Sequence, residues 1–270
     1  ADFFQRFTDD DPYSAVAWYN LGQYWYRREE YGKAAEAFDY AIVISADFYD
    51  AHHWLADAFV CQEQFHKAIS EFELSYPVGE PTDEALCNIG ECYEKLREWD
   101  LARRYYRQAL ELNPEMDEAW FGQGVLMQEQ ERWLEAIHFF RKATELYADS
   151  GEYWAALGAA ENQVGNIVSA LEAYEKATEV APEEAQGWVN WSAILYEQGH
   201  FAEAASLVQH AVDLHPHEAH FHYMRCAYLM SDGRLREAYQ SLETALALNY
   251  DQHILLFEPA LLRLIDQHRA

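Results

Sequence analysis

Apolar and small residues recur along this chain at one fixed interval. Trp120, Trp154 and Trp188 are evenly spaced, and Trp18 lies three of the same intervals before Trp120. If each repeat is numbered so that these tryptophans occupy position 4, the repeats begin at residues 15, 49, 83, 117, 151, 185 and 219. A fixed period of this length is typical of architectures in which each repeat packs on its neighbours. The period therefore assigns residues 15–252 to seven repeats in one register.

Within this register, four positions carry small or large apolar side chains in nearly every repeat. Position 20 is always alanine, and position 27 is alanine except for Ser75. Position 8 is always small: Gly22, Ala56, Gly90, Gly124, Gly158, Ser192 and Cys226. Position 24 is always large: Phe38, Phe72, Tyr106, Phe140, Tyr174, Val208 and Leu242. Small residues allow helices to approach closely, and large ones fill the space between them, so this pattern predicts closely packed helices.

This pattern resembles the tetratricopeptide repeat. Two repeats match the family signature W-x2-L-G-x2-Y…A-x3-F…P well. The matching residues are WYNLGQYW (18–25) with Ala34 and Phe38, and WAALGAAE (154–161) with Ala170, Tyr174 and Pro182. The resemblance covers nearly the whole chain. It implies two antiparallel helices per repeat, A and B, stacked into an all-α, right-handed superhelical solenoid.

Glycine and proline mark the expected helix ends. Gly165, Gly199 and Gly233 occupy position 15, which suits a helix C-terminus that needs a left-handed residue. Prolines occupy position 32 in three repeats and end helix B there, because proline lacks the N–H donor that a helix needs.

The segments that flank the seven repeats are also predicted to be helical. Residues 1–14 align with a helix B whose helix A is missing, because Phe4 falls at position 24 and Pro12 at position 32. We therefore expect the array to continue upstream. Residues 253–270 depart from the repeat but remain amphipathic, which predicts a C-terminal capping helix over the apolar face of the last repeat.

The charge balance narrows the class of partner. The chain has 47 acidic and 19 basic residues, and its formal net charge is -28. A polyanion would be repelled by this charge, which argues against nucleic acid and against an anionic membrane surface as partners. No run of 18 apolar residues and no signal-peptide pattern is present, so we expect a cytoplasmic protein. The acid excess with few lysines resembles proteins adapted to high salt.

No sequence pattern indicates catalysis. The chain has no GxSxG, GxxxxGK[ST], HExxH or GxGxxG motif. Its four cysteines form no CxxC pair and have no zinc-ribbon spacing, and Cys87 and Cys92 point in different directions on one predicted helix. We therefore predict a protein that is not an enzyme and needs no cofactor.

The segment HPHEAHFH (215–222) raises the possibility of a metal site, because histidine is a common ligand for transition metals. The register separates these histidines. His222 stands at position 4, where other repeats have tryptophan, and His220 at position 2 should face the groove. His215 and His217 fall in the turn between repeats. We predict no metal site, and only His215, His217 and His220 stay weak candidates.

The family resemblance implies a concave groove lined mainly by helix A at positions 2, 5, 6, 9, 12 and 13. In the first three repeats, positions 5 and 9 hold a mixed and increasingly acidic set that includes Asp57 and Cys87, whereas in the last four they are apolar or aromatic. The predicted partner-binding residues are Tyr19, Asn20, Gln23, Arg27, His53, Asn88, Glu91, Lys95, Phe121, Val125, Gln128, Ala155, Ala159, Asn162, Val189, Asn190, Ala193, Tyr196, His220, Tyr223, Ala227 and Met230.

A carboxylate clamp, as in the chaperone-binding members of the family, would need lysine or arginine at positions 5, 9 and 13. Only Arg27 and Lys95 are candidates, and they lie two repeats apart, so we do not predict a clamp. Asn20, Asn88 and Asn190 at position 6 could instead bond to the backbone of a ligand.

The resulting hypothesis is a non-catalytic scaffold that binds a peptide or helix through the apolar floor of repeats four to seven. One alternative is that the small residues of this floor only permit tight curvature. Another is a structural role through self-association, suggested by Phe3, Phe4 and Phe7 near the start of the chain.

Overall fold

The computed structural model describes residues 11–248 of the chain. Within this range it contains fourteen helices and no strand. The first helices of the pairs are α2 (Ala15–Tyr26), α4 (Tyr49–Cys61), α6 (Asp83–Lys95), α8 (Asp117–Glu129), α10 (Gly151–Gln163), α12 (Ala185–Glu197) and α14 (Ala219–Ser231). The second helices are α3 (Tyr31–Ile44), α5 (Phe65–Phe72), α7 (Trp99–Leu112), α9 (Trp133–Leu146), α11 (Ile167–Val180), α13 (Phe201–Leu214) and α15 (Leu235–Ala247).

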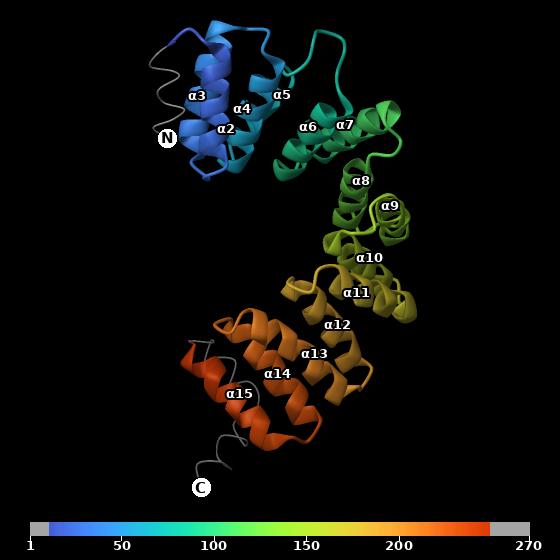
Figure 1. Ribbon diagram of the computed structural model, residues 1–270. Coiled ribbons are helices and arrows are strands. Elements are labelled where there is room, and N and C mark those ends of the chain that lie inside the picture. The colour runs from blue at the N-terminus through green and yellow to red at the C-terminus, as the bar shows by residue number, and fades with distance from the viewer. Residues whose placement is uncertain (1–10, 249–270) are drawn as a thin grey trace. The chain divides into compact units, whose positions relative to one another are not determined.

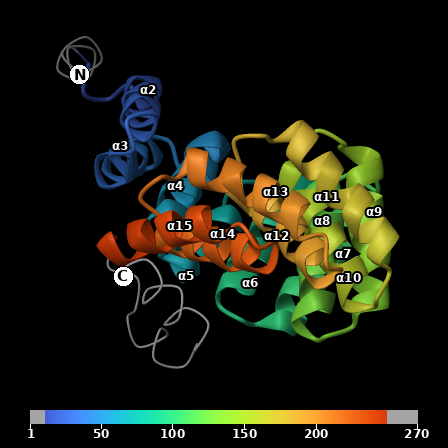
Figure 2. The ribbon, with the colours of Figure 1, turned by 90° about the horizontal axis from the view of Figure 1, so that it is seen from below.

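These helices belong to two compact units that divide after Glu131. The N-terminal unit contains α2 to α8 and the C-terminal unit contains α9 to α15 (Figure 1). Within each unit every helix packs against the next one along the chain. Three first helices also contact the next first helix: α2 contacts α4, α6 contacts α8, and α10 contacts α12. Figures 1 and 2 both show α14 and α15 side by side at the end of the described chain.

The core of each repeat is built from the positions that the sequence pattern marks. The alanine at position 20 is fully buried in all seven repeats. At position 8, Gly22, Gly90 and Gly158 pack against the aromatic ring at position 24 of the same repeat, since a Cβ added to Gly158 would lie 2.9 Å from the ring of Tyr174. Where position 8 is larger, as at Ser192, position 24 is the smaller Val208. The two positions therefore share one volume, and close packing couples their sizes.

Position 15 adopts a left-handed backbone in all seven repeats. The predicted glycines confirm this, because φ is +80° at Gly165, +84° at Gly199 and +79° at Gly233. In the other four repeats the position is not glycine, but φ is still positive: 61° at Glu29, 58° at Glu63, 60° at Arg97 and 56° at Glu131. The tight connection between the two helices imposes this conformation, because the following N–H bonds to the carbonyl at position 11, as in Gln64 N to Phe59 O (2.8 Å).

A ring at position 4 ties six of the seven described first helices to the turn that precedes them; the exception is α6, which has Leu86 there. The indole Nε1 of Trp120 donates a hydrogen bond to the carbonyl of Pro114 at 2.9 Å, and Trp18, Trp154 and Trp188 make the equivalent bond. His222 Nε2 makes the same contact with the Pro216 carbonyl at 2.9 Å, and His52 with that of Ala46 at 3.2 Å. Because a carbonyl only accepts, each histidine supplies the N–H that tryptophan supplies elsewhere.

Repeat two departs from the common pattern. Its second helix, α5, has only 8 residues and ends at Phe72, whereas the other second helices have 13 or 14. Residues 73–82 form an irregular connection that contains Pro77 and Pro81. Pro77 lies where the other second helices continue, and its missing N–H and the restriction on the preceding residue explain the early end.

The predicted helices within residues 1–14 and 253–270 fall largely or wholly outside the described residues. Phe3, Phe4 and Phe7 lie outside them as well. None of the helices between residues 11 and 248 is long and apolar enough to cross a membrane.

Candidate partner-binding surfaces

All of the predicted partner-binding residues keep some contact with solvent. Five of them are exposed, and the others are half-buried. The exposed residues are Asn20, Arg27, Glu91, Lys95 and His220. Cys87, which the register also placed on this face, is only 1% exposed, because α6 is packed against α5, α7 and α8. Helix A thus presents a surface at the predicted positions, except at Cys87.

In the N-terminal unit, the surface on α4 and α6 is acidic. His53 Nε2 lies 3.7 Å from Asp57 and 3.6 Å from Glu84, so one imidazole faces two carboxylates on neighbouring helices. Loss of hydration raises the pKa of Asp57, and the charge of Glu84 raises it further, whereas His53 acts in the opposite direction. On this part of the surface, two carboxylates thus face a single basic side chain.

Glu91 continues this acidic surface along α6. Its outer part is open to solvent, but partial desolvation and the charges of Glu94 and Glu118 raise its pKa to about 7, against the pull of Lys95. Lys95 itself lies 3.8 Å from Glu94. Glu94 also accepts a hydrogen bond from the hydroxyl of the buried Tyr106 at 2.9 Å. Lys95 is therefore already engaged with an acidic neighbour, which further disfavours a carboxylate clamp.

The remaining predicted residues of this unit are partly engaged in local contacts. Gln23 Nε2 donates to the Tyr19 hydroxyl at 2.9 Å, and the Tyr19 ring packs 4.9 Å from that of Phe48. Phe121, Val125 and Gln128 are half-buried on α8. Because α8 belongs to the N-terminal unit, the apolar floor predicted for repeats four to seven is divided between the two units.

In the C-terminal unit, the same face is apolar. Ala155 and Ala159 on α10 pack against a core of Ala170, Tyr174 and Ile194. Tyr223, Ala227 and Met230 on α14 pack against a second core that includes Leu229 and Leu242. Trp191 on α12 packs against both cores, and its ring stacks 6.2 Å from that of Trp188. Sequence reasoning missed Trp191, although an aromatic residue at position 7 was visible in the register.

Tyr196 has a more structural role than the sequence suggested. Its ring stacks on the buried Tyr228 at 4.6 Å, and its hydroxyl lies 3.2 Å from the Ser231 hydroxyl. In repeat one, Tyr26 occupies the same position, and its hydroxyl lies 3.4 Å from the thiol of Cys61. Both tyrosines thus connect one first helix to the next. One face of the Tyr196 ring is therefore covered, and Tyr196 stays a predicted partner-binding residue that is half-buried.

Val189, Asn190 and Ala193 present the middle of this face on α12. All three are half-buried. The side-chain oxygen of Asn190 accepts a hydrogen bond from Gln186 Nε2 at 2.7 Å. Asn162 is half-buried on α10, as Asn88 is on α6. Asn162 and Asn190 thus lie beside the apolar residues of this unit, whereas Asn88 belongs to the N-terminal unit.

A buried carboxylate in the C-terminal unit has a structural explanation. Glu161, only 1% exposed, stands at position 11, where other repeats have apolar or aromatic residues. It is paired with Arg141 from α9 and accepts a hydrogen bond from Asn166 Nδ2 at 2.7 Å. Both oxygens are therefore satisfied within the protein, and Glu161 is not a candidate for acid or base chemistry.

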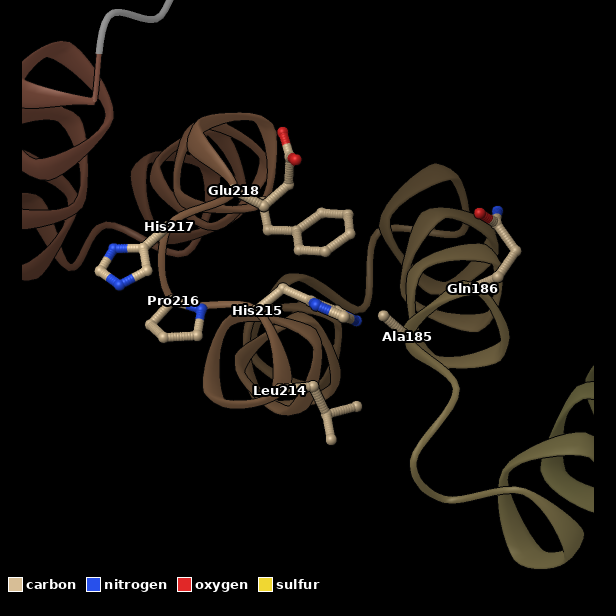
Figure 3. A pocket seen from close by; sticks show the side chains of 8 residues that line it. Ala185, Gln186, Leu214, His215, Pro216, His217 and Glu218 are labelled. Atoms are coloured by element: carbon tan, nitrogen blue, oxygen red, sulfur yellow. The ribbon is translucent and has the colours of Figure 1, made fainter. Parts of the chain in front are cut away.

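The histidines of residues 215–222 do not converge. Figure 3 shows the His215 ring directed towards Ala185, whereas His217 points away on the other side of the turn. His222 is bonded to the Pro216 carbonyl. Among the described residues, no group of three or more histidine, cysteine, aspartate or glutamate side chains could hold a metal ion. The weak candidate site of His215, His217 and His220 therefore has no support.

Comparison with known proteins places this chain in a repeat family. Family models described as tetratricopeptide repeat match residues 1–51, 83–116, 118–150, 155–219 and 189–249. A search of curated proteins found no matching relative.

Several solved structures share the fold. A chain of the APC/C hetero-tetramer Cut9–Hcn1 matches with a TM-score of 0.68 and 18% identity over 90% of this chain, which spans 45% of that chain. PilF of Pseudomonas aeruginosa matches with a TM-score of 0.65 and 18% identity, over 75% of this chain and 92% of that one. YrrB, described as a TPR protein with an unusual peptide-binding site, has a TM-score of 0.51 and 22% identity, over 68% of this chain and 95% of that one.

These likenesses confirm an all-α helical repeat solenoid. Since the family models match most of the residues, and the first helices begin at the predicted repeat starts, the chain belongs to the tetratricopeptide repeat family.

Proposed function

We propose that this protein is a non-catalytic scaffold that binds a peptide or helix of a partner protein on the first-helix face of the C-terminal unit. The observation that carries the proposal is the continuous apolar character of positions 5 and 9 on α10, α12 and α14. The cores lie beneath this face, and its residues are half-buried rather than fully covered. An apolar strip flanked by asparagine amides suits a segment that offers both side chains and backbone polar groups.

The fold comparison supports the general class of function. Tetratricopeptide proteins with related folds include a subunit of a hetero-tetramer and a protein with a peptide-binding site. The chain's net charge of -28 fits the same proposal, because it would favour partners whose flanking residues are basic.

The test compares two aspartate substitutions in the same unit. Val189 lies on the proposed face, whereas Val168 on α11 is 71% exposed and lies on a second helix. A displayed library of random twelve-residue peptides is selected on the wild-type protein, and the affinities of enriched peptides are measured by fluorescence anisotropy. We expect Val189→Asp to weaken binding at least about tenfold, or ~1.4 kcal/mol. We expect Val168→Asp to leave the affinity unchanged.

Circular dichroism confirms folding of both variants, and Val189→Thr, which conserves volume, gives a second reading if Val189→Asp unfolds. Equal affinities for the wild type and all three variants would remove the groove assignment. Failure to enrich any peptide would also count against it.

The second candidate function is assembly through self-association, and one observation favours it. At positions 26 and 29, repeats four and five carry the ion pairs Lys142–Glu145 and Lys176–Glu179, each with an N–O distance of 2.6 Å. Repeat one carries Tyr40 and Val43 there, which are 55% and 75% exposed. The Tyr40 ring also stacks on Trp18 at 4.6 Å. Repeat one thus exposes an apolar patch where repeats four and five expose charge.

The double variant Tyr40→Lys/Val43→Glu installs the charge pair of repeats four and five on this patch. If the patch drives self-association, light scattering will show a larger mass for the wild type than for the variant at the same concentration. Identical monomeric masses at high concentration would eliminate this candidate.

A further inference from the structure

A surface pocket of about 560 Å³ opens in the C-terminal unit where two first helices begin. Ala185 and Gln186 from the start of α12 line one side. Leu214 at the end of α13, the turn 215–218, and Phe221 on α14 line the other side. Figure 3 shows His215 extending across the pocket towards Ala185. The pocket therefore lies at the ends of helices, away from the positions 5 and 9 that form the proposed groove.

Hydrogen bonds hold the wall of the pocket in place. Glu218 N bonds to the His215 carbonyl at 3.0 Å, and Phe221 N bonds to the Glu218 carbonyl at 3.2 Å. The ring of His222 fixes the Pro216 carbonyl from the side of α14. A ligand would therefore meet a preformed surface, which reduces the entropy cost of binding.

Repeat six differs from the preceding repeat in two residues that line this space. In repeat five, Gly151 and Ala181 occupy the positions of Ala185 and His215. A Cβ added to Gly151 would lie 2.5 Å from the Cβ of Ala181, so that junction is closed by direct contact. In repeat six the larger His215 faces Ala185, and its ring lies 6.3 Å from that of Phe221. The pocket is thus lined by residues that differ from those of the preceding repeat.

The lining combines apolar walls with the carboxylate of Glu218. Leu214, Pro216 and Phe221 supply apolar surface. Gln186 is engaged with Asn190. Across residues 11–248 the side chain of Glu218 has no hydrogen-bond or ion-pair partner, although it lines the same pocket as the Phe221 ring. The complementary ligand is a cation on an apolar stem.

We propose that this pocket binds an arginine side chain of a partner polypeptide. The aliphatic stem lies against Leu214 and His215, and the planar guanidinium pairs with the Glu218 carboxylate while it stacks on the ring of Phe221. Lysine binds more weakly, because an ammonium group is more strongly hydrated and does not offer a planar, two-pronged donor. This site goes beyond the proposed groove and would select partners that carry arginine beside their docking segment.

The test uses two small probes that differ in charge but hardly in shape. N-acetyl-L-arginine amide and N-acetyl-L-citrulline amide are titrated into the full chain, and the aromatic NMR signals of His215 and Phe221 are followed. We expect saturable shifts with the arginine probe and an affinity for the citrulline probe at least about tenfold lower, which equals ~1.4 kcal/mol. Equal affinity for both probes, or no shift at either residue, would overturn the proposal.

Matched variants then test whether the Glu218 carboxylate binds the arginine probe. Glu218→Gln should abolish the preference for the arginine probe, whereas Glu184→Gln, at the equivalent position of the preceding repeat, should retain it. Ala185→Leu should fill the pocket and weaken both probes; circular dichroism reports its folding, and Glu218→Gln carries the test if it unfolds. Equal losses for Glu218→Gln and Glu184→Gln would point to diffuse charge and reject the pocket.

The groove proposal is tested independently of the pocket proposal. Val189→Asp should lose peptide binding but keep the response to the arginine probe. If Val189→Asp removes both, the pocket is not an independent site.

Discussion

The two compact units contain the same repeat but differ in what their first helices present to solvent. On α4 and α6 of the N-terminal unit, positions 5 and 9 include His53, Asp57 and Glu91, and the carboxylates there crowd one another. On α10, α12 and α14 of the C-terminal unit, these positions are alanine, valine or tyrosine. Positions 8, 20 and 24 are buried in both units. The core therefore defines the repeat, and the surface positions are free to specialise.

The units also differ in how they make the same turn. The three repeats whose left-handed position lies in the C-terminal unit use glycine there, whereas the four in the N-terminal unit use glutamate or arginine. Glycine therefore adopts this left-handed backbone without strain, whereas glutamate and arginine adopt it with strain. The packing of the helix pair imposes the conformation whichever residue occupies the position.

The largest expected effect concerns the one described repeat that buries a charge at position 11. Arg141→Ala leaves Glu161 buried without its cation and should destabilise the protein by roughly 3–5 kcal/mol. Urea denaturation measures the change. The exposed pair of Arg132 and Glu135 provides the control, and Arg132→Ala should cost less than about 1 kcal/mol.

Replacing both partners sharpens this test. Glu161→Met with Arg141→Met gives the C-terminal unit the apolar position 11 found in other repeats and should be neutral or stabilising. A double variant as unstable as Arg141→Ala would show that the ion pair does more than satisfy a buried carboxylate.

The second effect tests the shared volume of positions 8 and 24. Gly158→Ser forces the added side chain against Tyr174 and should cost about 1–3 kcal/mol. Adding Tyr174→Val should recover part of that loss, because Ser192 and Val208 already coexist in repeat six. The free energy of unfolding of the single and double variants measures the coupling, and simple additivity of two losses would contradict it.

The third effect is a pH dependence in the N-terminal unit. The pKa of Glu91 is raised from 4.5 to about 7 in the folded protein. Between these values the folded chain binds more protons than the unfolded chain, so this group's contribution to stability falls as pH rises from about 4.5 to about 7 and is then constant. Glu91→Gln should flatten the slope in that window and stabilise the protein at pH 8 by about 1 kcal/mol or less, since solvent screens an exposed carboxylate.

Added salt tests whether neighbouring charges cause this pH dependence of stability. Screening of Glu94 and Glu118 by ~1 M sodium chloride should reduce the wild-type slope and narrow the difference from Glu91→Gln. A slope that Glu91→Gln leaves unchanged would assign the pH dependence to other groups.

The smallest effect exchanges the turn residues of the two units. Glu63→Gly should stabilise by roughly 0.5–1 kcal/mol, because glycine adopts the left-handed backbone without a Cβ penalty. Gly199→Glu should destabilise by a similar amount. Thermal unfolding measures both, and changes of the same sign would show that strain at this position does not distinguish the units.

Much of the fold was readable from the register, whereas less of the surface was. Alanine at position 20 and a large residue at position 24 are buried in every repeat, as their spacing predicted. The left-handed turns at Glu29, Glu63, Arg97 and Glu131 were not predicted, because sequence marks such a turn only when glycine fills it. The short α5 was also missed, since one proline outweighed the regular period.

The predicted binding face shows the same division. The repeat register placed the predicted partner-binding residues where solvent reaches them. It could not show that the Tyr196 ring is stacked on Tyr228 or that Cys87 is buried. The burial of these two side chains depends on contacts with other helices, and the sequence of the helix that carries each side chain does not show those contacts. The pocket beside His215 was likewise hidden, because its walls come from three helices and the turn between two of them.

By itself the sequence determined the period, the helix pairs and the residues that make the core, because periodic packing constrains the same positions in every repeat. The tertiary structure alone decided which surface side chains remain available. There His222 makes the hydrogen bond to a carbonyl that tryptophan makes in other repeats, Glu161 is buried beside its cation, and Glu218 lines a pocket with Phe221. The physical reason is that availability depends on contacts between repeats, and those contacts vary from one junction to the next while the period does not.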